Sequence, residues 1–214
     1  MENAISFAQI LFIFIAMTYE LFFALAGFVF GTVFTPGPNN LMLMASGANF
    51  GFRRSLPHLT GVAVGFPLMI LPVGLGVMQL FDAFPALTWI MTALSVAYML
   101  WLTWKVANAA PPREGETQGT PLSFLQACAF QWVNPKAWAM ALGAITLYAA
   151  SRDVTAILWV SGTYLLVGCF SASTWTLLGQ QLRRLLTRPA QLRAFNWTMA
   201  ALLLASLAAI LLQR

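Results

Sequence analysis

T-P-G-P-N-N, residues 35–40, interrupts a long apolar run. No charged residue occurs from Leu21 to Phe52, so the interruption lies inside a hydrophobic region and not in a charged loop. Two prolines around a glycine cannot continue an α-helix, because each proline lacks a backbone donor and restricts the residue before it. The pattern predicts a helix that breaks here and resumes from about Asn39 to Phe50.

A second interruption, Q-W-V-N-P-K at residues 131–136, lies in the run from Thr117 to Ser151. Pro135 removes a backbone donor there, and Lys136 is the only charge in the run. A charged residue inside an apolar span is a functional hypothesis by default. Two other interpretations of Lys136 stay open, namely snorkelling towards the membrane surface and a structural hydrogen-bond network.

The composition around these breaks excludes a soluble protein. The 214 residues are 60% hydrophobic and only 8% charged, whereas an ordinary globular domain has about 25% charged residues. A helix needs about 20 apolar residues to cross a hydrocarbon core. Six runs free of charge, apart from Lys136, are long enough: residues 21–52, 55–81, 83–104, 117–151, 154–182 and 194–213.

The order of the runs predicts a repeated architecture. Residues 1–107 contain a broken helix and two further spans, residues 108–121 form a polar cytoplasmic connection, and residues 122–214 repeat the first order. With three spans in each half, the second half must enter the membrane from the opposite side. We therefore expect one all-α integral membrane domain over residues 1–214. Its six transmembrane helices would form two inverted three-helix repeats, with the first helix of each half broken at a proline motif.

The second span is expected over roughly residues 58–80. Gly61 and Gly65 have the small-xxx-small spacing that allows close helix contact, and Pro67 and Pro72 are expected to kink the helix. His58 is interpreted as a solvated helix end.

The start of the chain leaves alternatives open. One helix from Ala4 to Phe34 would be about 46 Å long at about 1.5 Å per residue, which exceeds the thickness of a bilayer. The helix tilts and protrudes, or Ala4–Ala16 lies at the interface, or Met17 is the true start.

Basic residues orient the chain, because they favour cytoplasmic loops. The side expected to be cytoplasmic holds Arg53, Arg54, Lys105, Arg113, Arg183, Arg184, Arg188 and Arg193, and the other side holds Arg152 and Arg214. Both termini are therefore expected in the periplasm. Basic clusters beside membrane spans are typical of contact with anionic lipids, so membrane lipids and not nucleic acid are the expected partners.

The two breaks form the candidate substrate site. Interrupted helices at matching positions of two halves are the best sequence indication of a transporter site. Free amides at a half-helix N-terminus favour an anion such as a carboxylate, so a small zwitterion is the expected ligand. The residues expected to bind it are Thr35, Gly37, Asn39 and Asn40 from the first half and Gln131, Asn134 and Lys136 from the second, with Pro36, Pro38 and Pro135 as helix breaks.

No cofactor, metal site or enzymatic activity is expected. The chain has one histidine and two cysteines, Cys128 and Cys169, with no CxxC motif and no Cys/His pair. No serine or cysteine nucleophile lies near a usable base in the sequence.

Five segments resemble the LysE/RhtB-type amino-acid exporters, and most of all the cysteine/O-acetylserine exporter type. They are T-P-G-P-N-N (35–40), G-F-R-R (51–54), A-Y-x-x-W-L-x-W-K (97–105), N-P-K (134–136) and W-x-x-x-G (175–179). The resemblance implies six helices, a bacterial inner membrane and efflux of amino acids driven by the proton gradient. One departure is Phe66 after Gly65, where many relatives have an acidic residue, which argues against a carboxylate relay at that position.

We predict a secondary transporter that exports small amino acids or derivatives by alternating access, with cysteine, O-acetylserine or other neutral amino acids as substrates. An alternative is a membrane-embedded thiol-redox carrier that uses Cys128 and Cys169, which requires Cα atoms within about 7 Å of each other. A structural or regulatory subunit is a third interpretation, but it would not require two polar breaks at membrane depth.

Overall fold

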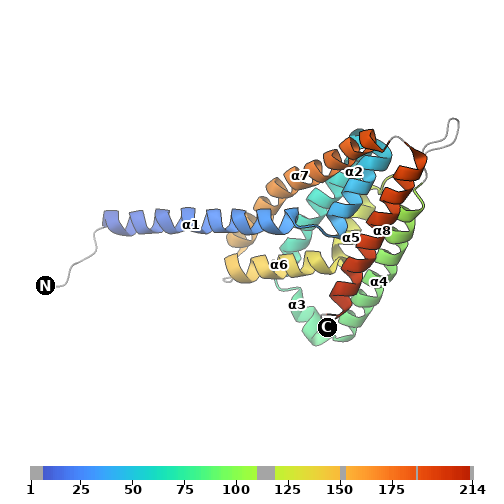
Figure 1. Ribbon diagram of the computed structural model, residues 1–214. Helices are drawn as coiled ribbons and strands as arrows, with labels where there is room; N and C mark the ends of the chain where they lie inside the picture. The colour runs from blue at the N-terminus through green and yellow to red at the C-terminus, as the bar shows by residue number, and fades with distance from the viewer. Residues whose placement is uncertain (1–6, 110–118, 150–152, 187, 213–214) are drawn as a thin grey trace.

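Every element in the described part of the chain is a helix (Figure 1). The computed structural model describes residues 7–109, 119–149, 153–186 and 188–212, with the backbone alone for residues 7–18, 210 and 211. Arg113, Arg152, Arg214 and most of the polar connection lie outside these residues. The helices are α1 (Phe7–Phe34), α2 (Pro38–Gly74), α3 (Met78–Ala83), α4 (Ala86–Ala107), α5 (Phe124–Val133), α6 (Pro135–Tyr148), α7 (Val154–Leu185) and α8 (Pro189–Leu212).

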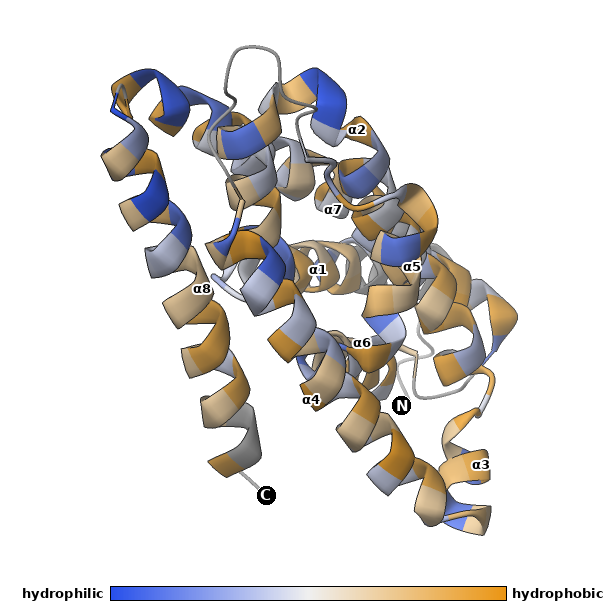
Figure 2. Ribbon diagram, turned by 90° about the vertical axis from the view of Figure 1, so that its right-hand side faces the viewer, coloured by the Kyte–Doolittle hydropathy of each residue, from blue (hydrophilic) through white to orange (hydrophobic). Residues whose placement is uncertain are grey.

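Four of these helices, α2, α4, α7 and α8, are long and apolar enough to cross a membrane. Shorter apolar helices accompany them, among them the Tyr19–Phe34 part of α1. The hydrophilic residues gather at one end of the bundle, while the helix faces below that end are mostly hydrophobic (Figure 2). The described chain is thus an all-helical, multi-pass membrane protein.

Both predicted helix breaks are present. α1 ends at Phe34 and α2 begins at Pro38, one residue before the predicted restart at about Asn39. In the second half α5 ends at Val133 and α6 begins at Pro135. Proline is the first residue of the new helix in each case, where its missing amide hydrogen and fixed φ cost nothing.

The expected kinks at Pro67 and Pro72 are not where α2 departs from helical geometry. The non-helical dihedral angles inside α2 occur at Gly51, with φ 76° and ψ 169°. A positive φ is accessible to glycine because it has no Cβ. The backbone amide of Phe52, which follows the kink, donates a 2.6 Å hydrogen bond to Oε1 of Gln180 on α7. The helix then ends at Gly74, earlier than the predicted end near residue 80.

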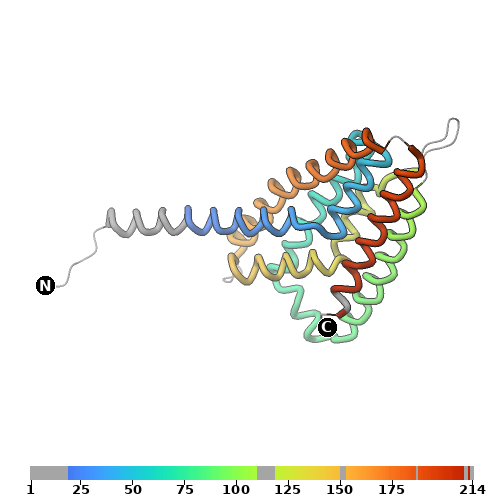
Figure 3. The backbone as a smooth tube through the Cα atoms, in the orientation of Figure 1, coloured from blue at the N-terminus to red at the C-terminus, as the bar shows by residue number. Residues whose placement is uncertain are grey.

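Close glycine contacts join α2 to α7. A Cβ on Gly47 would collide with the backbone carbonyl of Thr176, and a Cβ on Gly179 would collide with that of Met44. Small residues allow two helix backbones to approach each other in this way. The α2–α7 pair therefore forms the most extensive helix contact among the described residues, and the two helices lie side by side in Figure 3.

The predicted contact through Gly61 and Gly65 is confirmed, and its partner is α5. A Cβ on Gly61 would lie 2.5 Å from the carbonyl oxygen of Phe124, and one on Gly65 would lie 2.6 Å from Cα of Cys128. The two glycines on α2 and the two residues on α5 are each four apart, so the helices meet over a full turn. The end of α5 then lies beside the start of α2, where Gln131 and Asn39 are hydrogen-bonded.

α1 and α6 run side by side (Figure 3). The rings of Phe28 and Tyr148 lie 5.6 Å apart, and the Tyr148 hydroxyl donates to the Ala24 carbonyl at 3.2 Å. Apolar side chains of α1, α2, α6 and α7 then share one buried core. Packing thus brings together the end of α1, the start of α2, the start of α6 and the middle of α7.

Candidate functional site

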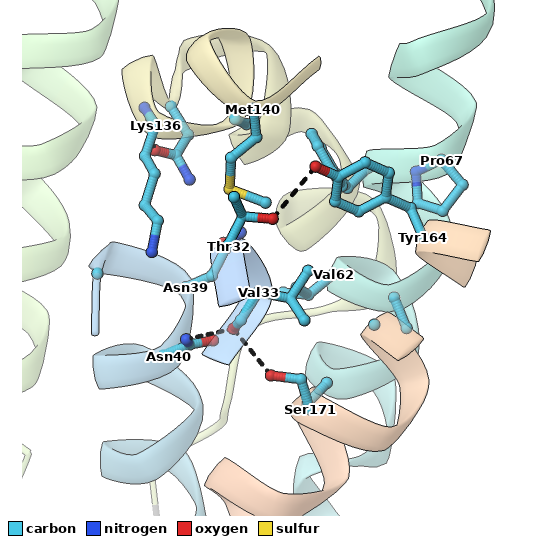
Figure 4. Close-up of a pocket in the computed structure, with 17 residues that line it drawn as sticks. Thr32, Val33, Asn39, Asn40, Val62, Pro67, Lys136, Met140, Tyr164 and Ser171 are labelled. Atoms are coloured by element: carbon cyan, nitrogen blue, oxygen red, sulfur yellow. Dashed lines mark hydrogen bonds between the residues drawn. The ribbon is translucent and has the colours of Figure 1, made fainter. Parts of the chain in front are cut away.

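A cavity lies where these four helices meet (Figure 4). Its volume is about 50 Å³, which is room for a few water-sized groups. Its lining combines amides, hydroxyls and one ammonium with an apolar wall. The lining residues are Thr32, Val33, Gly37, Asn39, Asn40, Val62, Ala63, Phe66, Pro67, Asn134, Lys136, Ala137, Met140, Tyr164, Gly168, Ser171 and Ala172.

Lys136 reaches from the second break to the first. Its Nζ donates a 2.6 Å hydrogen bond to the carbonyl oxygen of Thr35 and lies 3.5 Å from that of Pro36. The carbonyls at a helix C-terminus are its negative end, so the ammonium lies against the end of α1. Lys136 therefore lines the cavity and takes part in a hydrogen-bond network.

Asn40 and Ser171 bind the Val33 carbonyl near the end of α1, and Asn40 shares the Thr35 carbonyl with Lys136. Asn40 Nδ2 donates to the carbonyl oxygens of Val33, at 2.7 Å, and Thr35, at 2.9 Å. Ser171 Oγ on α7 donates to the same Val33 oxygen at 2.9 Å (Figure 4). Side chains thus replace the backbone hydrogen bonds that the proline motif removes, and they hold the break in place.

The two half-helix N-termini differ. At α6, Asn134 Oδ1 accepts from the Lys136 amide at 3.1 Å, and the Asn134 carbonyl accepts from the Ala137 amide at 2.9 Å. The expectation of free amides at this break is therefore wrong, because Asn134 caps the helix.

At α2 the N-cap residue is Gly37, which has no side chain to cap the helix. The first amide that bonds back is that of Leu41, to the Gly37 carbonyl at 2.9 Å. The amides of Asn39 and Asn40 are therefore the free donors of this terminus, beside the Lys136 ammonium.

Asn39 links the two breaks. Its Nδ2 donates to Gln131 Oε1 at 2.9 Å, and Gln131 Nε2 donates back to Asn39 Oδ1 at 3.2 Å. Gln131 is fully buried and also donates to the Ala127 carbonyl at 2.9 Å. Gln131 stands behind Asn39 and does not line the cavity.

Five of the seven predicted binding residues line the cavity, namely Gly37, Asn39, Asn40, Asn134 and Lys136. Gln131 contacts one of them, Asn39. Thr35 is exposed, and its side chain donates to the Gly31 carbonyl at 2.5 Å, so only its own carbonyl reaches Lys136. Among the predicted break residues, Pro38 and Pro135 begin helices, while Pro36 lies in the exposed segment between α1 and α2.

Gly37 is required by the approach of Lys136. Its backbone is extended, with φ −178°, so its conformation does not demand glycine. A Cβ there would lie 2.8 Å from Cδ and 3.0 Å from Nζ of Lys136. The glycine therefore leaves room for the lysine side chain from the opposite half.

Sequence reasoning missed the hydroxyl groups of the cavity. Thr32 Oγ1 and the Tyr164 hydroxyl lie 3.2 Å apart across it (Figure 4), and Ser171 lies further along α7. A signal existed: Tyr164, Gly168 and Ser171 are spaced i, i+4, i+7, which places them on one helix face.

His58 corrects another expectation. Its side chain is only 2% exposed and is not a solvated helix end. Neither ring nitrogen has a hydrogen-bond partner. It lines a second cavity, to which residues of α2 on both sides of the kink at Gly51 contribute.

The cysteines are both free. Cys128 is half-buried, with its thiol 3.3 Å from the Gly61 carbonyl oxygen, and Cys169 is exposed on α7. Within the described residues, no group of three or more His, Cys, Asp or Glu side chains could hold a metal ion.

Comparison with known proteins identifies a family and several relatives of this chain. The family model described as LysE type translocator matches residues 29–214. The chain is 32% identical over 191 residues to the cysteine/O-acetylserine efflux protein of Escherichia coli (strain K12), covering 87% of this chain and 95% of that protein. The protein of the same name from Shigella sonnei (strain Ss046) has the same identity and coverage. No solved structure matches the chain.

Proposed function

The chain belongs to the LysE type translocator family, and we propose on that basis that it exports small amino acids or their derivatives by alternating access. Cysteine and O-acetylserine are the first substrates to test, because they appear in the names of the relatives. We further propose that the substrate binds in the cavity between the two helix breaks.

The observation that carries this proposal is the opposite polarity of the two helix ends at the first break. The free amides of Asn39 and Asn40 and the Lys136 ammonium attract an anion. The carbonyls of Val33 and Thr35, at the C-terminus of α1, give the other side of the break the negative polarity that attracts a cation, and the cation bound to Thr35 in this structure is the Lys136 ammonium. An α-amino acid carries both charges on adjacent atoms. The break therefore suits a zwitterion better than it suits a purely apolar or purely anionic solute.

The remaining lining suits a small side chain. Val62, Ala63, Phe66 and Met140 form the apolar part of the cavity wall. The pair of hydroxyls from Thr32 and Tyr164 lies beside it and can bind a polar group. We propose that this wall selects short side chains and that the hydroxyls bind a thiol or an acetyl oxygen.

Six spans in two inverted repeats are the proposed topology. The broken pair α1–α2 corresponds to the broken pair α5–α6, the part of α2 after Gly51 to α7, and α4 to α8. Corresponding helices pack against each other, α2 with α7 and α4 with α8, which supports a two-fold relation between the halves. Each half contributes one break to the site, so a rocking of one half against the other opens it to alternate sides.

The proposed location is a bacterial inner membrane with both termini in the periplasm. The hydrophilic end in Figure 2 is the cytoplasmic end in this orientation. A reporter fused after the last residue and active only in the periplasm supports the orientation, and a cytoplasmic reporter contradicts it.

The experiment that tests the function is efflux from proteoliposomes. The purified protein is reconstituted, and the vesicles are loaded with a panel of labelled neutral, acidic and basic amino acids together with O-acetylserine. We expect the small neutral compounds to leave faster than from protein-free vesicles. Movement of none of the panel would reject the exporter proposal.

The thiol-redox carrier remains the alternative proposal, and one variant separates the two. Replacement of both Cys128 and Cys169 by serine removes every thiol of the chain. Export should survive the change, because neither residue lines the cavity. A redox carrier would lose all activity.

A further inference from the structure

A second cavity lies at the hydrophilic end of the bundle, between α2, α4 and the segment that leads into α5. It has a volume of about 50 Å³. Its lining residues are Met42, Ala45, Ser46, Asn49, Phe50, His58, Leu102, Lys105, Val106, Ala109, Thr120, Pro121 and Leu122. A hydrogen bond of 3.0 Å from Arg54 Nη2 to the Gly119 carbonyl fastens this segment to α2. The amino-acid cavity described above shares none of these residues.

His58 is the first sign that this cavity binds a ligand. It is 2% exposed, it lines the cavity, and both of its ring nitrogens lack a hydrogen-bond partner. A buried polar group without a partner costs about 1–3 kcal/mol. Ser46 adds a hydroxyl, whose Oγ lies 3.1 Å from that of Ser55.

The charge in the cavity is positive. Lys105 on α4 contributes an ammonium, which lies 5.3 Å from the centre of the Trp101 ring. No aspartate or glutamate is among the lining residues that the structure describes. An ammonium, an imidazole and a hydroxyl without a carboxylate form a donor set for an anion.

The register of α2 connects this cavity to the first one. Asn39, Met42, Ser46 and Asn49 follow one another at i, i+3, i+7 and i+10, so they share one face of the helix. Asn39 lines the first cavity, and the other three line the second. Ser46 lies about 10 Å from Asn39 along the helix axis, at about 1.5 Å per residue.

We propose that the second cavity is a carboxylate site, in which Lys105 and His58 bind the carboxylate of the amino-acid substrate at the cytoplasmic end before it passes along α2 to the first cavity. This assignment rests on the proposed function for the identity of the ligand. The neutral imidazole donates one hydrogen to the carboxylate, and Lys105 supplies the charge. The site would increase the occupancy of the transporter at low substrate concentration.

Trp101 provides a direct measurement, because a carboxylate bound to Lys105 changes the surroundings of its ring. Acetate, which has the carboxylate but no amino group, is titrated into the purified full-length protein at constant ionic strength while tryptophan fluorescence is recorded. We expect a saturable change that is lost in Trp101→Phe. In Lys105→Met the half-saturating concentration should rise at least tenfold, and Lys105→Arg should restore most of the affinity.

His58→Gln, which keeps a donor and an acceptor, should weaken acetate binding less than His58→Phe. Arg188→Gln serves as the control, since it removes a positive charge from the exposed connection before α8, lies in neither cavity and should leave the acetate titration unchanged. Equal acetate affinity in wild type and Lys105→Met would overturn the proposal. Chloride that saturates the same signal at the same concentration as acetate would also overturn it, because the site would then not select a carboxylate.

Transport distinguishes this proposal from the function on which it rests. In proteoliposomes, Lys105→Met should raise the substrate concentration for half-maximal efflux and preserve the maximal rate. If no amino acid moves at all, the exporter proposal fails, while the acetate titration still decides whether the second cavity is a carboxylate site.

Discussion

Asn39 and Gln131 join the two proline breaks through a reciprocal pair of amide hydrogen bonds, 2.9 Å in one direction and 3.2 Å in the other. The two residues lie 92 positions apart, one on α2 just after the first break and the other on α5 just before the second. A conformational change that moves one half against the other must either break these hydrogen bonds or move both residues together. Under the proposed alternating access, this contact would couple the site to the relative position of the halves.

We expect Asn39→Ala and Gln131→Ala each to lower the free energy of unfolding by about 1–3 kcal/mol, because the first change leaves the buried Gln131 amide and the second the half-buried Asn39 amide without its partner. The double variant should lose less than the sum of the two, as is usual for residues in direct contact. Denaturation of the four proteins in mild detergent measures this coupling. Asn108→Ala, at the exposed C-cap of α4, is the control, and strictly additive effects would contradict the pairing.

Gly37→Ala should impair export, because its new methyl group would displace the Lys136 side chain from the Thr35 carbonyl. We expect the efflux rate to fall about tenfold or more, the scale of one lost charge-assisted hydrogen bond. Gly27→Ala is the matched control, since a Cβ there meets no atom within 4 Å. Equal efflux by both alanine variants would show that Gly37 does not serve to admit Lys136.

Tyr164→Phe removes one hydroxyl from the cavity wall and leaves the ring in place. The stability should change little, because the Thr32 hydroxyl keeps its bonds to the carbonyls of Phe28 and Val29. We expect the substrate concentration for half-maximal efflux to rise several-fold. Tyr98→Phe loses a hydroxyl that bonds the Gln126 carbonyl outside the cavity. If Tyr98→Phe raises that concentration as much as Tyr164→Phe does, the result contradicts a role of the Tyr164 hydroxyl in substrate binding.

Gly47→Ala and Gly179→Ala should prevent the close crossing of α2 and α7, because each Cβ would collide with a backbone carbonyl that cannot move aside. Overpacking of this kind costs about 1–3 kcal/mol and occasionally more. The yield of monodisperse protein in detergent and its melting temperature measure the loss. Gly162→Ala, on α7 with no atom within 4 Å of the new Cβ, should match the wild type.

Much of this arrangement could be predicted from sequence because it follows from local backbone chemistry. Prolines inside a charge-free run forced both helix breaks, and the spacing of Gly61 and Gly65 indicated a helix contact. The position of the main bend in α2 could not be predicted in the same way. Pro67 and Pro72 lie inside α2 without non-helical dihedral angles. Gly51 has a positive φ, which glycine can adopt anywhere, so its residue type alone did not indicate a bend at this position.

The polar part of the site was harder to predict for a related reason. Asn39, Asn40 and Lys136 stand out because they are polar in an apolar region. Tyr164 and Ser171 do not stand out, because hydroxyls are common in apolar helices and often bond to their own backbone. The cap of α6 had a signal in the sequence, because Asn before a proline at the first helical position is typical of an N-cap, whereas Gly37 before Pro38 leaves α2 as the terminus with free amides.

The most direct test of amino-acid export through the two breaks is the efflux of labelled O-acetylserine and cysteine, kept reduced, from preloaded proteoliposomes containing wild-type or Lys136→Met protein. Arg188→Gln, on the exposed connection before α8, controls for the loss of a positive charge elsewhere. We predict that the wild type and Arg188→Gln release the label faster than protein-free vesicles and that Lys136→Met is at least tenfold slower. Release by Lys136→Met at the wild-type rate, or no release by any of the proteins, would contradict the proposed site and the proposed function respectively.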